Sequence, residues 1–269
     1  MTADPRLERL AHLNLAEFGR ESARWSAARG GIHEADGVVR IMTGTTFPVL
    51  CNGALRLDPR ADAGALVDGA FEWFGARGRG FSVWTRPDAD ADLVDVLVAR
   101  GFHGSPPGSP EMICETPLDP PAPSVDLRWV TDERGVRDWV AVNAAAYNTY
   151  GMPLEVLPDI LVDVDAFLAP HLHHVVAYVD EAPCAAAQVL LSHGIGGVYW
   201  VGTTEAARGR GLGEAVTRAV TNRAFEHGAA FVSLQASPMG EPIYRRLGYR
   251  ELYRYVVWVH WPDAPEEAT

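Results

Sequence analysis

One strand-turn-helix unit in the C-terminal half restricts the fold of this chain more than any other feature. Val198 to Val201 is an apolar run typical of a strand, and Leu212 to Phe225 has helical spacing. The turn between them contains the glycines Gly209, Gly211 and Gly213. Backbone N–H groups in a glycine-rich turn can approach an anion closely, and a helix N-terminus adds partial positive charge. The sequence therefore predicts an anion-binding turn.

Two arginines, Arg208 and Arg210, add fixed positive charge to this turn. A P-loop is excluded, because it needs a lysine and the chain contains none. The Gly-x-Gly-x-x-Gly pattern of dinucleotide-binding folds also fails, because Glu214 stands where its third glycine belongs and would repel phosphate. The pattern that remains is Arg-x-x-Gly-x-Gly, formed by Arg208, Gly211 and Gly213.

This pattern resembles the pyrophosphate-binding motif of the GNAT family, the GCN5-related N-acetyltransferases. Downstream, residues 231–235 are typical of a short buried strand, and residues 241–247 of a helix that Gly248 ends. The run Ile-Tyr-Arg-Arg-Leu-Gly-Tyr at 243–249 is similar to the family signature in which a tyrosine precedes Leu-Gly-aromatic. The resemblance covers residues 125–261.

The resemblance implies that the chain binds acetyl-CoA as a cosubstrate. The strand before the turn would pair with the pantetheine arm, and one of its N–H groups would polarise the thioester carbonyl. The turn and the helix start would donate N–H groups to the pyrophosphate. The expected cofactor-binding residues are Val201, Gly202, Thr203, Arg208, Gly209, Arg210, Gly211, Leu212, Gly213, Glu214 and Ser237.

Tyr244 is the expected catalytic acid, because the resemblance assigns the matching tyrosine to protonation of the CoA thiolate. A tyrosine of ordinary pKa, near 10, is close in basicity to a thiolate. The general base stays open: some relatives carry a glutamate on the strand before the turn, but residues 193–199 contain no carboxylate. Candidate acceptor-site residues are Tyr147, Glu155 and His193, and a water relay is an equal alternative.

We predict transfer of an acetyl group to a primary amine of a small molecule or amino-acid-like metabolite. The alternatives are a CoA-binding regulatory module without turnover and transfer of a longer acyl group. His173 and His174 have no third ligand at metal spacing, so no metal is expected. A net charge of −12 argues against nucleic-acid binding, and no apolar run is long enough for a membrane span. The three scattered cysteines favour a cytoplasmic protein, and a homodimer is left open.

An internal repeat predicts two tandem GNAT-like domains. Residues 71–115 and 224–249 share the order helix end, strand, helix and Gly-aromatic. The predicted division is a degenerate domain at 1–117, a proline-rich linker at 118–124, a catalytic domain at 125–263 and a tail at 264–269. The expected fold is α/β (α+β), with mixed, mostly antiparallel sheets flanked by helices. In the C-terminal half we expect helices at 132–147 and 154–168 and strands at 174–179, 184–191 and 250–260.

The N-terminal domain contains a false match to the anion-binding motif. Ala76–Gly80 repeats Ala207–Gly211 letter for letter, but it follows a helix and precedes a strand. Under the repeat, the true counterpart lies at residues 57–64, where Asp62 would repel phosphate. We therefore expect no CoA site there and assign this domain a structural role or a wall of the acceptor site.

Overall fold

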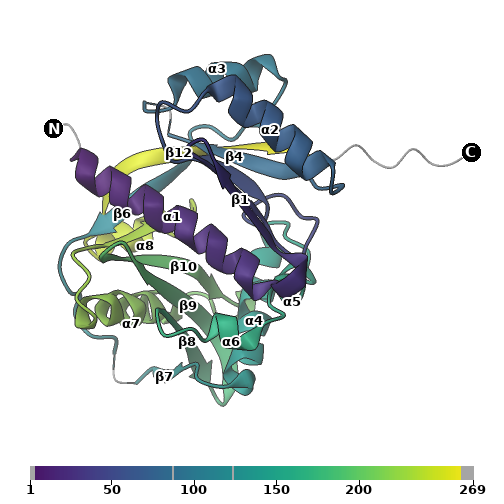
Figure 1. Ribbon diagram of the computed structural model, residues 1–269. Coiled ribbons are helices and arrows are strands. Elements are labelled where there is room, and N and C mark those ends of the chain that lie inside the picture. The colour runs from purple at the N-terminus through teal and green to yellow at the C-terminus, as the bar shows by residue number, and fades with distance from the viewer. Residues whose placement is uncertain (1–3, 87, 123, 262–269) are drawn as a thin grey trace, which may run out of the picture.

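The computed structural model describes residues 4–86, 88–122 and 124–261 (Figure 1). Its longer helices are α1 (Pro5–Trp25), α2 (Ala63–Gly75), α3 (Ala91–Ala99), α4 (Glu133–Asn148) and α7 (Leu212–Glu226). Its shorter helices are α5 (Val156–Ile160), α6 (Val164–Phe167) and α8 (Glu241–Arg246), with 3-10 turns η1 (Ala27–Arg29) and η2 (Glu205–Ala207). The expected tail at 264–269 lies outside the described residues.

The strands of the first half are β1 (Gly31–Ala35), β2 (Val38–Met42), β3 (Gly53–Arg56), β4 (Phe81–Thr85), β5 (His103–Gly104) and β6 (Ser109–Cys114). Those of the second are β7 (Asp126–Trp129), β8 (Leu172–Val179), β9 (Ala182–Ser192), β10 (Ile195–Thr203), β11 (Val232–Gln235) and β12 (Arg250–His260). Together they form one twelve-stranded sheet of order β1-β2-β3-β4-β12-β6-β11-β10-β9-β8-β7, with β5 on β12. The predicted mixed, mostly antiparallel sheet flanked by helices is confirmed, since only β3–β4 and β10–β11 are parallel among the described pairs.

The two halves exchange strands at the centre of this sheet. Strand β6, from the first half of the chain, lies between β11 and β12 of the second half and is antiparallel to both. Strand β12 pairs with β6 over Arg250–Tyr255 and with β4 over Val256–His260. Each half is therefore completed by a strand of the other, although the predicted boundary at 118–124 separates them in sequence.

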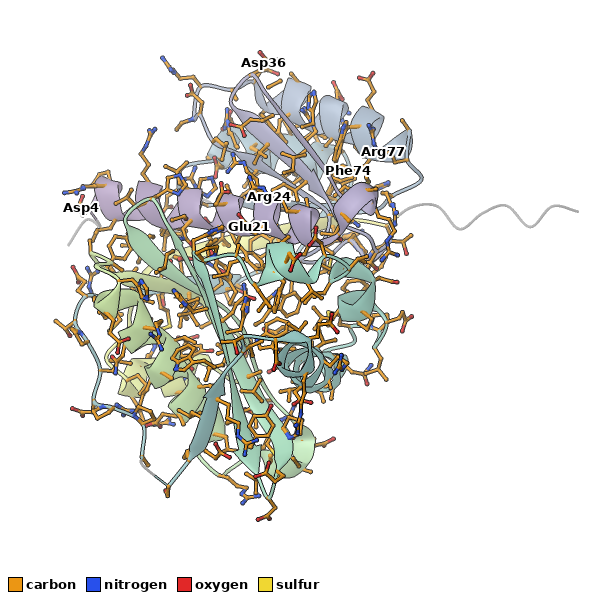
Figure 2. The ribbon with its side chains drawn as sticks, turned by 60° about the horizontal axis from the view of Figure 1, so that its bottom comes forward. Asp4, Glu21, Arg24, Asp36, Phe74 and Arg77 are labelled. Carbon is orange, nitrogen blue, oxygen red and sulfur yellow. The ribbon has the colours of Figure 1, made fainter. Side chains whose placement is uncertain are left out.

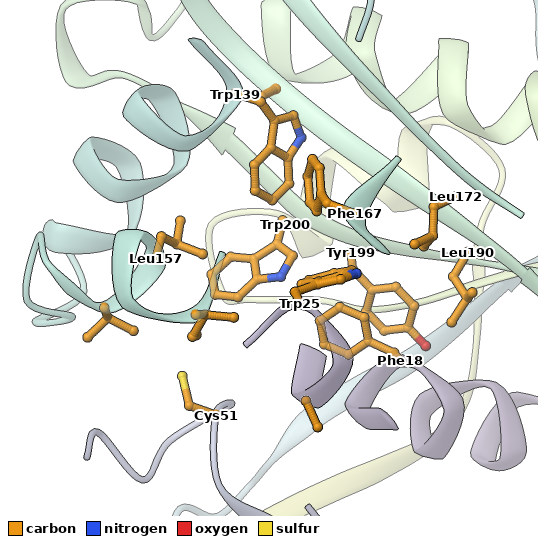
Figure 3. Packing of buried hydrophobic residues seen from close by; sticks show 14 of the residues in the cluster. Phe18, Trp25, Cys51, Trp139, Leu157, Phe167, Leu172, Leu190, Tyr199 and Trp200 are labelled. Atoms are coloured by element: carbon orange, nitrogen blue, oxygen red, sulfur yellow. The ribbon is translucent and has the colours of Figure 1, made fainter. Parts of the chain in front are cut away.

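Helix α1 lies between the two halves, a placement for which the sequence analysis had no prediction (Figure 1). It begins at Pro5, where the Asp4 carboxylate accepts a hydrogen bond from the Arg6 N–H. Phe18 stacks on Tyr199 of β10 with ring centroids 3.9 Å apart, and the same cluster holds Trp25 (Figure 3). This cluster also contains Ile41 and Trp84 of the first half, so its apolar burial joins α1 to both halves.

Near its C-terminal end, α1 also carries a polar cluster around one buried carboxylate (Figure 2). The Glu21 side chain is almost fully buried, and it pairs with Arg24 of the same helix. His171, just before β8, lies 2.9 Å from the Glu21 carboxylate. These contacts tie the helix end to the C-terminal half. Among the described helices, α1 included, none is long and apolar enough to cross a membrane.

The single helix predicted for residues 154–168 is wrong, because the chain forms α5 and α6 with a break at 161–163. The N–H groups of Val162 and Asp163 donate to the carbonyl of Trp25, at 2.9 and 2.8 Å. Asp163 then caps α6 by accepting from the Ala166 N–H. A contact with the end of α1, far away in sequence, therefore replaces the helical hydrogen bonds at this point.

Candidate functional site

The predicted anion-binding turn connects β10 to α7 as expected. Gly209 and Gly211 have φ values of +76° and +75°, a left-handed conformation that favours glycine. Gly211 is the N-cap of α7, and within the described residues no side chain caps this helix. The N–H groups of Leu212, Gly213 and Glu214 lie in the uncapped first turn and can bind an anion.

Arg208 and Arg218 determine the charge around this turn. Nη2 of Arg208 donates to Oγ1 of Thr149 at 2.8 Å, which fixes the guanidinium beside the turn. Arg218 binds the Glu214 carboxylate through Nε and Nη2, at 3.0 and 2.9 Å. This ion pair offsets the negative charge of Glu214, so the backbone N–H of that residue stays compatible with phosphate. Arg210 is exposed.

Strand β10 diverges from β11 just before the turn. The two strands pair only from Gly196–Val232 to Val198–Leu234. The pairing of β10 with β9 shifts register between Tyr199 and Gly202, and Trp200 in this bulge has a φ of +51°. Beyond Val198, the described part of β10 therefore has no β11 partner, and a wedge opens between the strands.

Two cavities meet at this wedge. The first, here called the turn cavity, has a volume of about 370 Å³ and follows the turn, the start of α7 and α8. Of the predicted cofactor residues, it is lined by Val201, Gly202, Thr203, Arg208, Gly209, Gly211, Leu212, Gly213, Glu214 and Ser237, and Arg210 is not among its walls. The second, here called the inter-half cavity, has a volume of about 230 Å³. Both are lined by Tyr147, Val201, Ser237 and Tyr244.

Comparison with known proteins agrees with this geometry. Residues 162–257 match the family model described as an acetyltransferase (GNAT) domain. This region is a GNAT domain. The match includes the uncapped turn, the diverging strand and Tyr244, and it ends within β12.

The whole chain also resembles solved structures. A GCN5-related N-acetyltransferase from Kribbella flavida is 22% identical, with a TM-score of 0.68 over 94% of this chain and 97% of that one. A GCN5-related N-acetyltransferase from Sphaerobacter thermophilus is 15% identical, with a TM-score of 0.59 over 86% and 82%. A GCN5-related N-acetyltransferase-like protein from Streptococcus suis is 16% identical, with a TM-score of 0.56 over 92% and 99%. These likenesses concern the fold. The search of curated proteins found no match.

Tyr244 of the GNAT domain lies on α8 where the two cavities join. Its side chain is buried, and this burial raises the pKa of its hydroxyl well above the ordinary value. The group is therefore neutral at every physiological pH and a weaker acid than a tyrosine of ordinary pKa. Such a hydroxyl is suited to donating a hydrogen bond to a leaving sulfur. Ser237 is partly engaged, since its Oγ accepts from the Gly240 N–H at 3.1 Å.

The three candidate acceptor-site residues lie in different places. Tyr147, at the end of α4, lines both cavities and packs against Trp200 with ring centroids 4.7 Å apart. Glu155 is exposed just before α5, and His193 is exposed in the β9–β10 turn. Neither of these two lines either cavity. In the described residues, no cluster of three or more His, Cys, Asp or Glu could hold a metal.

The walls of the inter-half cavity come from both halves and from α1. Phe18 and Leu15 of α1 face Tyr199 and Trp200 of β10, and Trp84 of β4 lies on the N-terminal side. Among the described residues that line this cavity, none is charged. Its polar side chains, apart from the tyrosines and tryptophans, are Ser22, Asn52, Ser82, Ser109, Gln235 and Ser237. Such a wall suits an uncharged organic group.

Sequence reasoning missed Glu111, a buried carboxylate beside this cavity. Glu111 lies on β6 and is 0% exposed. Nε2 of Gln235 donates to its Oε2 at 2.5 Å. Its Oε1 has no hydrogen bond of good geometry among the described residues, although the buried Ser233 hydroxyl is close enough to help lower the pKa of the carboxyl. Burial raises the pKa of Glu111 to about 7. A glutamate inside the strand-like run 111–115 was the available signal, but the run does not reveal which sheet receives it.

The N-terminal counterpart of the anion-binding turn is closed. Strand β3 leads into α2 as β10 leads into α7, but the Asp62 carboxylate caps α2 and accepts from the Ala65 N–H at 2.7 Å. The duplicated run Ala76–Gly80 follows α2 and precedes β4, as predicted. Arg77, labelled in this loop in Figure 2, stacks over the Trp73 ring at 4.7 Å and donates to the Trp73 carbonyl.

Proposed function

We propose that this protein transfers an acetyl group from acetyl-CoA directly to the primary amine of a small molecule. The observation that carries the proposal is the uncapped start of α7, with left-handed glycines in front of it and a cavity that leads to Tyr244. Backbone N–H groups at 209–214 would bind the pyrophosphate, and Arg208 would support them. The corresponding helix start in the N-terminal half, at α2, is capped by the Asp62 carboxylate. This negative charge would repel a second pyrophosphate, so we propose one CoA site per chain.

The diverging strand supplies the next part of the proposed site. Residues 201–203 of β10 have lost their β11 partner, so their backbone groups would pair with the pantetheine arm. This path would bring the thioester to the junction of the two cavities. A backbone N–H in the bulge would stabilise the negative charge that develops on the thioester oxygen. The Tyr244 hydroxyl would donate to the departing sulfur.

The inter-half cavity would receive the acceptor. Its walls are aromatic or aliphatic over most of their extent and carry no charge among the described residues. We therefore propose an amine attached to an uncharged, largely apolar group. The N-terminal half contributes Trp84, Asn52 and Ser82 to these walls, which supports its predicted role beside the acceptor. The same cavity favours one alternative, a longer acyl chain in place of an apolar acceptor.

A transfer assay tests the proposal. The protein is incubated with acetyl-CoA and a panel of aromatic, aliphatic and polycationic amines, and both thiol release and the acetylated product are measured. We expect turnover with apolar amines and little with polyamines. A comparison of acetyl-, butyryl- and octanoyl-CoA identifies the longer-acyl alternative. CoA binding without release for any amine or acyl-CoA would favour the regulatory module instead.

A further inference from the structure

The inference concerns Glu111, whose strand β6 enters the GNAT sheet from the other half of the chain. In the sheet register Glu111 lies opposite Gln235 of β11 on one side and Tyr253 of β12 on the other. The strand exchange therefore holds its carboxylate at the centre of the sheet. A GNAT domain without β6 would lack this group.

The carboxylate lies directly behind one wall of the inter-half cavity. Ser109, two residues earlier on the same face of β6, lines the cavity, and so does the hydrogen-bonded partner Gln235. Tyr199 lines it too, and the charge of Glu111 is close enough to help raise the pKa of that tyrosine. Three neighbours of Glu111 thus contact the space in which we place the acceptor.

Only neutral groups compensate for burying this acid. A buried carboxylate is unfavourable unless it is paired, and in the described part of the chain no basic side chain pairs with Glu111. The Gln235 amide donates to Oε2, and the buried Ser233 hydroxyl is close enough to help lower the pKa of the carboxyl, but Oε1 has no hydrogen bond of good geometry within the described residues. A polar atom left without a partner beside a cavity indicates a ligand that supplies one.

We propose that Glu111 accepts the proton from the ammonium group of the acceptor across one water molecule. The inference rests on the proposed acetyl transfer. The ammonium gives one proton to Oε1 and becomes a neutral amine, and Glu111 becomes a carboxylic acid. The amine nitrogen then forms the C–N bond as the C–S bond breaks. Its second departing proton goes to the CoA sulfur by way of Tyr244, and Glu111 later releases its proton to solvent.

The shifted pKa values of the tyrosines and the histidine near Glu111 lie far from 7, whereas that of Glu111 is about 7. Tyr199, Tyr253 and Tyr255 have pKa values raised well above 10 by burial. His12 of α1, hydrogen-bonded to Tyr255, has its pKa lowered to about 4 by burial. Beyond them, Arg86 and Asp90 form an ion pair with Nε 3.2 Å from Oδ2. The raised pKa of Glu111 suits a proton acceptor at neutral pH.

The test compares kcat/KM between pH 5.5 and 9 for the wild type, Glu111→Gln and Glu111→Asp. Glutamine keeps the shape and can still accept from Gln235, so CoA affinity and the circular-dichroism spectrum should be unchanged. At pH 8 we expect Glu111→Gln to lose at least about 100-fold in kcat/KM. Its pH profile should also lack the rising limb, with an apparent pKa near 7, that we expect for the wild type. Glu111→Asp should keep a pH-dependent limb and part of the activity.

Glu115→Gln is the matched control, because Glu115 directly follows β6 and is exposed in an ion pair with Arg250. It should behave like the wild type. A Glu111→Gln variant that keeps the wild-type pH profile and rate would overturn the inference while the proposed function stands. A wild type that turns over no amine would overturn the proposed function, and this inference with it.

Discussion

Replacing Glu111 by glutamine should make the protein more stable at alkaline pH, because it removes a buried charge and keeps an acceptor for Gln235. Burial raises the pKa of Glu111 from 4.5 to about 7, so the folded state binds this proton more tightly than the unfolded chain does. Stability from this group is therefore fully present below pH 4.5 and is lost as the pH rises to 7. Glutamine, which has no charge to bury, does not incur this loss.

The size of the effect follows from linkage. A change in pKa of one unit corresponds to 1.36 kcal/mol, so ionising Glu111 in the folded protein costs about 3 kcal/mol above pH 8. Relative to the wild type, Glu111→Gln should gain roughly 2–3 kcal/mol between pH 5 and pH 8.5. The shifted histidines His12, His173 and His174 are common to both proteins, so their contributions cancel in the difference.

The assay is urea denaturation of the two proteins at pH 5 and pH 8.5, with Glu115→Gln as the exposed control. The free energy of unfolding is compared at each pH. A difference between Glu111→Gln and the wild type that stays constant with pH would refute the argument, because Glu111 would then titrate as an ordinary carboxyl. A larger advantage at pH 5 than at pH 8.5 would contradict its sign.

Three further results are expected. Gly211→Asp should weaken CoA binding at least about 100-fold by calorimetry, because it adds a negative charge to the turn that would bind the pyrophosphate. Gly228→Asp, at another left-handed glycine beyond the far end of α7, should not weaken it. Tyr244→Phe should lower kcat about 10- to 100-fold and leave CoA affinity unchanged, and a variant with the wild-type kcat would remove Tyr244 from the mechanism. Residues 118–269 expressed alone should not give a folded protein by circular dichroism, because β6 separates β11 from β12; a cooperatively folding fragment would show that the strand exchange is dispensable.

The sequence predicted the parts of the molecule that depend on local patterns. The turn at 208–213 and α7 could be predicted because left-handed glycines and a helix start leave a signature within a few residues. The helix around Tyr244 was predicted for the same reason, since Gly248 ends it. The sequence also predicted that Asp62 would repel phosphate at the start of α2. In the structure, the Asp62 carboxylate caps that helix by accepting from the Ala65 N–H.

The parts that could not be predicted depend on contacts between distant residues. The break after α5 arises because the Trp25 carbonyl, more than a hundred residues away, accepts the N–H groups of Val162 and Asp163. The strand-like pattern at 111–115 does not reveal that β6 enters the sheet of the other half. The position of Glu111 behind the inter-half cavity follows from that exchange and from the packing of α1.

A crystal structure with bound acetyl-CoA would show whether the turn before α7 holds the diphosphate. We expect one nucleotide per chain, with diphosphate oxygens within hydrogen-bonding distance of backbone nitrogens at 209–214 and the thioester beside Tyr244. A diphosphate bound elsewhere, such as at the start of α2, or a turn left empty at saturating acetyl-CoA, would contradict this expectation.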